Sequence, residues 1–67
     1  MGEDVMFPDL QALGTLRGIV DASQKAAREG DDERLSLARS LFEDYADAAR
    51  YVGVKAAEIQ TLRGQLA

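Results

Sequence analysis

Apolar and small residues recur at helical spacing through the second half of this chain, from residue 32 to residue 66. The steps between them alternate between three and four residues, which places them along one face of a helix. A single charged residue, Arg63, interrupts the row. The members of the row are Leu35, Ala38, Phe42, Tyr45, Ala49, Val52, Ala56, Ile59 and Leu66. The pattern predicts a long helix that packs along this face.

A second row beside the first widens the apolar face. It consists of Leu41, Ala48 and Leu62, and a face this wide suits packing against more than one helix. Gly53 is the one position where the helix is expected to bend or break, because Gly and its β-branched neighbours are poor helix formers. The apolar spacing continues unchanged across Gly53, which favours a continuous helix over residues 33–66. In the alternative, residues 55–66 fold back as a third short helix.

An earlier helix is predicted over residues 8–29. Pro8 is suited to the first helical turn, since it lacks the backbone N–H that a helix start leaves unpaired. Apolar residues then recur on one broad face, at Leu10, Leu13, Leu16, Ile19, Val20, Ala26 and Ala27. Residues 1–7 are expected to form a flexible arm before this helix.

The boundary between the two helices lies at residues 30–32. Gly30 suits the left-handed conformation just past a helix end, and Asp31 or Asp32 suits the N-cap of the next helix. The sequence therefore predicts one all-α domain over residues 1–67, an antiparallel hairpin whose second helix is the longer.

Small residues form a stripe on the first helix, at Gly14, Gly18 and Ala22. Each Gly costs a helix about 1 kcal/mol relative to Ala, so two glycines at four-residue spacing inside a helix need an explanation. Close approach of another helix is the interpretation that we favour, and a hinge or a groove for a partner are the alternatives.

Chain length and helix length together predict self-association. With 67 residues and no cysteine, the chain buries a small core and has no disulfide to support it. Helices of about 22 and 34 residues would be about 33 and 51 Å long, so the end of the second helix lacks cover within the chain. We expect a dimer that completes a four-helix bundle or a coiled coil. The predicted interface consists of Leu37, Tyr51, Val54, Ala56, Ile59, Leu62 and Leu66.

Residue types that carry most enzyme chemistry are missing from the chain. It contains neither His nor Cys, the commonest general base and the thiolate nucleophile. We expect no catalysis, no cofactor and no metal site. Glu43 and Asp47 are four residues apart and could share a cation in an oligomer, but a solvated face held by Arg39 and Arg50 explains them.

The charge balance is acidic, with 12 Asp and Glu against 8 Lys and Arg. Such a field repels phosphate backbones and disfavours nucleic acid, unless Arg34, Arg39 and Arg50 form a local basic patch. No apolar run approaches the roughly 20 residues that span a bilayer, and the first residues are acidic where a secretory signal is basic. We therefore expect a soluble cytoplasmic protein with no membrane contact.

These features predict a non-catalytic interaction module, such as a small acidic adaptor, regulator or assembly subunit. Its expected partners are a second copy of itself and another protein, bound through the apolar face of the second helix.

A run in the second helix, with Ser40 and Leu41 followed by Ala46, Asp47 and Arg50, resembles the plasmid-encoded repressor-of-primer family. Members of that family are helical hairpins that dimerise into four-helix bundles and bind paired RNA loops. The resemblance implies an RNA-binding hairpin as the alternative function.

Overall fold

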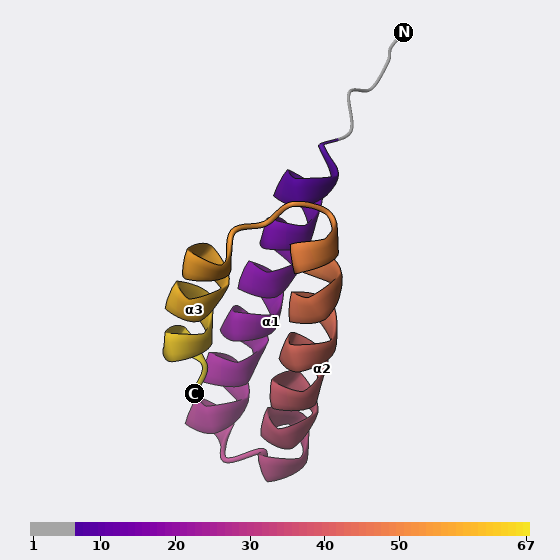
Figure 1. Cartoon of the computed structure of the whole chain (residues 1–67). Coiled ribbons are helices and arrows are strands. Elements are labelled where there is room, and N and C mark those ends of the chain that lie inside the picture. The colour runs from indigo at the N-terminus through magenta and orange to yellow at the C-terminus, as the bar shows by residue number, and fades with distance from the viewer. Residues whose placement is uncertain (1–6) are drawn as a thin grey trace, which may run out of the picture.

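The computed structural model describes residues 7–67, which form three helices joined by short turns. The helices are α1 (Pro8–Glu29), α2 (Asp32–Tyr51) and α3 (Ala56–Gln65). Figure 1 shows α1 and α2 side by side as an antiparallel hairpin, with α3 returning along one side of it. The all-α class is confirmed, and the described residues contain no strand. Residues 1–6 of the expected arm lie outside the described part of the chain.

The first helix has the same bounds that the sequence predicts. Pro8 occupies its first turn, and the Gln11 N–H donates to the Phe7 carbonyl at 3.0 Å. One face of α1 is buried, at positions three or four residues apart: Leu13, Leu16, Val20, Ser23 and Ala26. The amphipathic spacing therefore orients α1 toward the other two helices.

The turn after α1 uses the conformation that only Gly adopts easily. Gly30 has φ of 69°, and its N–H donates to the Ala27 carbonyl at 3.2 Å. The next N–H, of Asp31, donates to the Ala26 carbonyl at 2.9 Å. These two bonds satisfy carbonyls that the helix end leaves unpaired. The Asp31 carboxylate then accepts from the Arg34 N–H at 3.1 Å and caps α2.

The prediction of a continuous helix over residues 33–66 is wrong. The second helix ends at Tyr51, and Gly53 has φ of 108°. Its N–H donates to the Arg50 carbonyl at 3.2 Å, and the Val54 N–H donates to the Ala49 carbonyl at 2.9 Å. This is the same pair of bonds that closes α1 at Gly30. The chain reverses here, and the alternative of a third short helix describes the structure.

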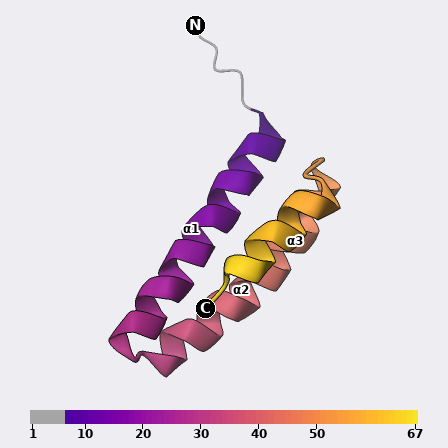
Figure 2. The ribbon, with the colours of Figure 1, turned by 90° about the vertical axis from the view of Figure 1, so that its left-hand side faces the viewer.

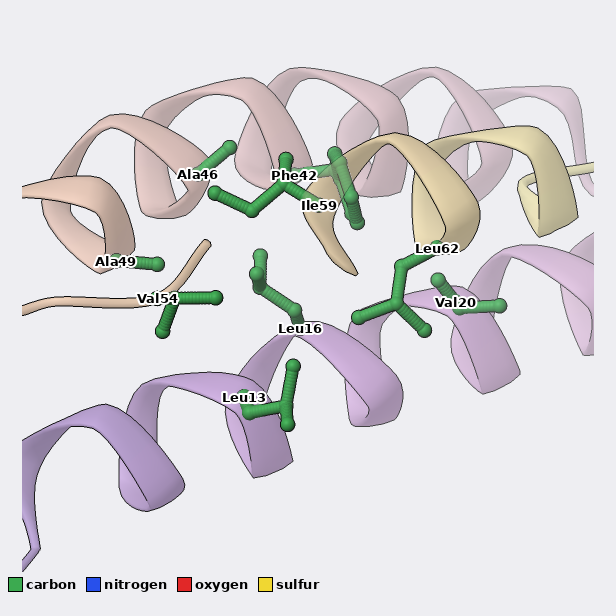
Figure 3. Packing of buried hydrophobic residues seen from close by; sticks show 9 residues of the cluster. All are labelled: Leu13, Leu16, Val20, Phe42, Ala46, Ala49, Val54, Ile59 and Leu62. Atoms are coloured by element: carbon green, nitrogen blue, oxygen red, sulfur yellow. The ribbon is translucent and has the colours of Figure 1, made fainter. Parts of the chain in front are cut away.

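The third helix completes the hydrophobic core, as Figure 3 shows. Ile59 and Leu62 of α3 are buried, and so is Val54 in the turn before it. They pack with residues of the hairpin, among which Leu16 and Phe42 have no exposed surface. The cluster consists of Leu13, Leu16, Val20, Phe42, Ala46, Ala49, Val54, Ile59 and Leu62. The expectation that Ile59, Leu62 and Leu66 lack cover within the chain is wrong, because the reversal at Gly53 brings α3 back onto the hairpin.

Hydrogen bonds fix the end of α3 to both helices of the hairpin. The Gln24 amide of α1 donates to the Gln65 carbonyl at 2.9 Å, and the Arg39 guanidinium of α2 donates to the Ala67 carbonyl at 2.9 Å. The Ala67 N–H donates to the buried Ser23 hydroxyl at 3.2 Å. That hydroxyl donates in turn to a backbone carbonyl of α1 at 2.7 Å, so its polar atom is satisfied.

Candidate protein-binding face

The residues predicted as an interface divide into two groups in the structure. Leu37 and Tyr51 of α2 are exposed, Tyr51 to 92%, and Ala56 is exposed at the start of α3. The other four belong to the interior or its edge: Val54, Ile59 and Leu62 are buried, and Leu66 is partly buried against the core. Those four stabilise the chain itself, so the predicted interface at the end of the second helix does not form one surface.

The small-residue stripe does not contact another helix of the described chain. Gly14, Gly18 and Ala22 are all exposed, and a Cβ added at either Gly would meet no neighbouring atom within 4 Å. Within the described residues no helix packs closely on the two glycines, because the face of α1 that α2 and α3 contact lies on the opposite side, at Leu16 and Val20. Close approach of a helix from another molecule stays a prediction. Ala22 borders a hollow beside α2.

A different set of apolar residues forms a continuous exposed stripe along α2. Its members follow one another at steps of four, four, three and four residues, which keeps them on one side of the helix. Leu37 is 58% exposed, Leu41 36%, Tyr45 47% and Val52 40%. We call this side of the α1–α2 hairpin the open face and define it by Leu37, Leu41, Tyr45, Ala48 and Val52.

Two hollows lie along the open face, between α1 and α2. The upper hollow has a volume of about 290 Å³ and lies where the two helices are far from their connecting turn. Its lining residues carry no charge: Pro8, Gln11, Ala12, Thr15, Tyr45, Ala48 and Val52. No residue of α3 lines either hollow. Figures 1 and 2 agree that α3 runs along one side of the hairpin, and the open face is a side that α3 leaves uncovered.

The lower hollow lies beside the turn and combines apolar walls with balanced charge. Its volume is about 500 Å³, and Leu37 and Leu41 form part of its wall. Four charged residues also line it, two of each sign: Lys25, Arg34, Glu29 and Asp31. Arg34 and Asp31 pair at 3.3 Å. The upper hollow of the open face thus has an uncharged lining, and the charges that line the lower hollow cancel.

The opposite side of α2 has a different chemistry, because it borders α3. The Arg63 guanidinium of α3 makes two hydrogen bonds of 2.9 Å to the Glu43 carboxylate and lies 5.7 Å from the centroid of the Phe42 ring. The hydrogen bonds from Arg63 lower the pKa of Glu43 below its ordinary value, and the same bonds raise the pKa of Arg63. Arg63, which interrupts the apolar row in the sequence, therefore ties α3 to α2.

The acidic and basic residues singled out in the sequence do not gather into a second site. Glu43 pairs with Arg63 rather than with the predicted Arg39. No group of three or more Asp, Glu, His or Cys in residues 7–67 is arranged to hold a metal ion. Arg34 pairs with Asp31 on the open face, while Arg39 bonds the Ala67 carbonyl beside α3. The three arginines of the expected patch, Arg34, Arg39 and Arg50, thus do not share one side of α2.

Comparison with models of protein families, with curated proteins and with solved structures finds no match for this chain. Within residues 7–67, none of the helices has the length and apolar character needed to cross a membrane.

The open face contains residues that sequence reasoning assigned to the core. Tyr45 and Val52 belong to the predicted packed row, yet both are exposed. A signal for the open face was present in the width of the apolar stripe, because Leu41 and Ala48 make it too wide for one neighbouring helix. Which row meets α3 and which stays exposed depends on where α3 returns.

Proposed function

We propose that this chain is a non-catalytic protein-binding module that uses the open face. The supporting observation is the row of four large apolar side chains left exposed beside two hollows, at Leu37, Leu41, Tyr45 and Val52. Scattered apolar residues on a surface are ordinary, but a contiguous apolar patch on a small monomer is typical of an interaction site.

The form of the open face suits a helical partner. The antiparallel helices α1 and α2 lie side by side and flank a groove. Apolar residues of α2, at steps of three and four, line one wall of it. An amphipathic helix places its apolar residues at matching steps and buries them in such a groove. The absence of His and Cys from the chain supports a role in binding rather than in catalysis.

The biological setting follows from this role. A small acidic module of this kind acts as an adaptor, a regulator or an assembly subunit. We place it in the cytoplasm, since a chain without cysteine fits a reducing compartment.

Site-specific photocrosslinking in the source cell tests the proposal. A photoreactive residue at Tyr45 on the open face is compared with the same residue at Ser40, which is exposed on α2 but lines neither hollow. We expect protein adducts, to any protein, from Tyr45 and not from Ser40. Equal adduct yields at the two positions, or none at Tyr45, would show that the open face is not a binding surface.

A further inference from the structure

The open face has the size that a specific interface requires. With 22 residues, α1 is about 33 Å long at about 1.5 Å per residue, and two adjacent helices are about 20 Å wide. One copy therefore offers at most about 660 Å², and two copies packed face to face over their whole length would bury up to about 1,300 Å² in total, at the low end of the range of specific protein complexes.

The charges on the open face select among possible partners. The chain as a whole has a net charge of −4, so contact between two copies through most surfaces brings acidic groups together. The open face lowers this cost, because the residues that line its upper hollow carry no charge and the two basic and two acidic residues that line its lower hollow balance. A strongly basic or acidic partner would gain nothing from such a face, whereas a second copy meets no net repulsion there.

Each copy of the open face offers both projecting apolar side chains and hollows that such side chains can fill. Large side chains, Leu37 and Leu41, project at the lower end, where they are 58% and 36% exposed. The uncharged hollow beside the small residues Ala12 and Ala48 lies at the upper end. An antiparallel copy would place the two leucines of each chain over the upper hollow of the other, and a two-fold axis would repeat the contact.

Resting on the proposed function, we propose that the occupant of the open face is a second copy of this chain. The two hairpins pack face to face and antiparallel, so that α1 and α2 of both copies form an inner four-helix layer and the two α3 helices lie outside. This arrangement differs from an assembly through the end of the second helix, because Ile59 and Leu62 stay in the core of each copy.

Sedimentation of the purified full chain tests the pairing. We expect the mass to rise from the 7.3 kDa monomer to twice that value as the concentration increases from low micromolar to near millimolar. A chain that stays monomeric over this range would overturn the self-pairing. If Tyr45 nevertheless crosslinked to another protein, the proposed function would stand while this inference failed.

Matched variants locate the contact. Leu41→Glu and Leu37→Glu each place a carboxylate in the apolar contact between the two copies, and we expect each to weaken the dimer by more than about tenfold. Leu10→Glu is the control, since Leu10 is 60% exposed and lies about 160° around α1 from Ala12 on the open face. Circular dichroism checks that each variant keeps its helices. A dimer that tolerates both α2 variants, or that Leu10→Glu weakens equally, would overturn the assignment.

A mixing experiment tests the antiparallel orientation. In that orientation residue 37 of one copy lies near residue 48 of the other, at both ends of the interface. We expect Leu37→Glu and Ala48→Lys to be monomeric alone and to form a heterodimer when mixed, because the two new charges attract. A mixture that remains monomeric would overturn the antiparallel arrangement.

Discussion

The two sides of α2 differ sharply in burial although their sequences are similarly apolar. Phe42 and Ala46 are 0% and 2% exposed, while the neighbouring positions Leu41 and Tyr45 are 36% and 47% exposed. A shift of one residue along the helix turns a side chain by about 100°, which here moves it from the core to the open face. The buried side is covered by α1 and α3 together, and the open side is not.

This comparison separates residues that stabilise the fold from residues that we propose bind a partner. Burial of Ile59 and Leu62 against the hairpin stabilises the chain, at about 1.5–3 kcal/mol for each large apolar side chain removed from water. The exposed leucines and Tyr45 contribute little to the stability of the isolated chain, because they remain in contact with water. Their apolar character is therefore not explained by the fold of the isolated chain, and the proposed function accounts for it.

The largest effect on the free energy of unfolding is expected for a substitution in the core. Ile59→Ala should lower the free energy of unfolding by about 2–5 kcal/mol, since it leaves a cavity in the core, and a 67-residue domain has little stability to lose. Leu37→Ala on the open face should change it by less than about 0.5 kcal/mol in dilute solution. Urea unfolding followed by circular dichroism measures both. Similar losses for the two variants would contradict the distinction between the faces.

A smaller effect tests the turn that brings α3 onto the hairpin. Gly53→Ala should cost about 1–2 kcal/mol, because φ of 108° is strained for any residue with a Cβ. The cost comes from the backbone alone, since a Cβ at this position meets no atom within 4 Å. Gly64→Ala inside α3 is the control, where Ala should be neutral or stabilising. Unchanged thermal unfolding of Gly53→Ala would favour a continuous second helix.

Substitutions at the exposed glycines of α1 are expected to stabilise the fold rather than destabilise it. Gly14→Ala and Gly18→Ala should each raise the free energy of unfolding by about 0.5–1 kcal/mol, because Ala favours the helix and nothing lies within 4 Å. Sedimentation of both variants gives the second readout. Loss of self-association with an intact fold would show that a partner approaches α1 closely at these glycines.

The smallest expected effect on stability comes from the Arg63–Glu43 pair, which joins α3 to α2. Its hydrogen bonds lower the pKa of Glu43 in the folded chain, so the pair stabilises the fold above the unfolded pKa of this carboxyl. That contribution is lost as the pH falls through the lower folded pKa. Both side chains are partly exposed, so the effect is small.

Thermal unfolding of wild type and Glu43→Gln between neutral and acidic pH measures this contribution. The wild type should unfold at a slightly higher temperature near pH 7, and the difference should shrink on acidification. A difference that is constant across the pH range would argue against a contribution from the ionised carboxylate.

The sequence predicted the hairpin well because its signals are local. Pro8 at the start of α1, Gly30 after its end and the Asp31 cap act within a few residues of where they stand. The same carbonyl-closing bonds form at Gly53, but there the flanking residues are Val52 and Val54 rather than acidic residues. The turn therefore lacked the polar residues that mark the first one.

The position of α3 could not be predicted from apolar spacing alone. Ile59 and Leu62 are three residues apart, a step that fits a new helix as well as the continuation of α2. Only the packing of the whole chain decides between the two, since Gly53 permits either conformation. The open face was missed for the same reason: Tyr45 and Val52 count as core residues until α3 is placed on the other side of α2.

The anchoring of α3 has a consequence for the order of folding. Its hydrogen bonds join residues 41 and 44 positions apart in the chain, whereas α1 and α2 are joined through a turn of two residues. Contacts between distant residues cost more loop-closure entropy and form later. We expect the hairpin to assemble first, so that Ile59→Ala mainly accelerates unfolding and barely slows folding in stopped-flow kinetics. A large decrease in the folding rate would instead place α3 in the folding nucleus.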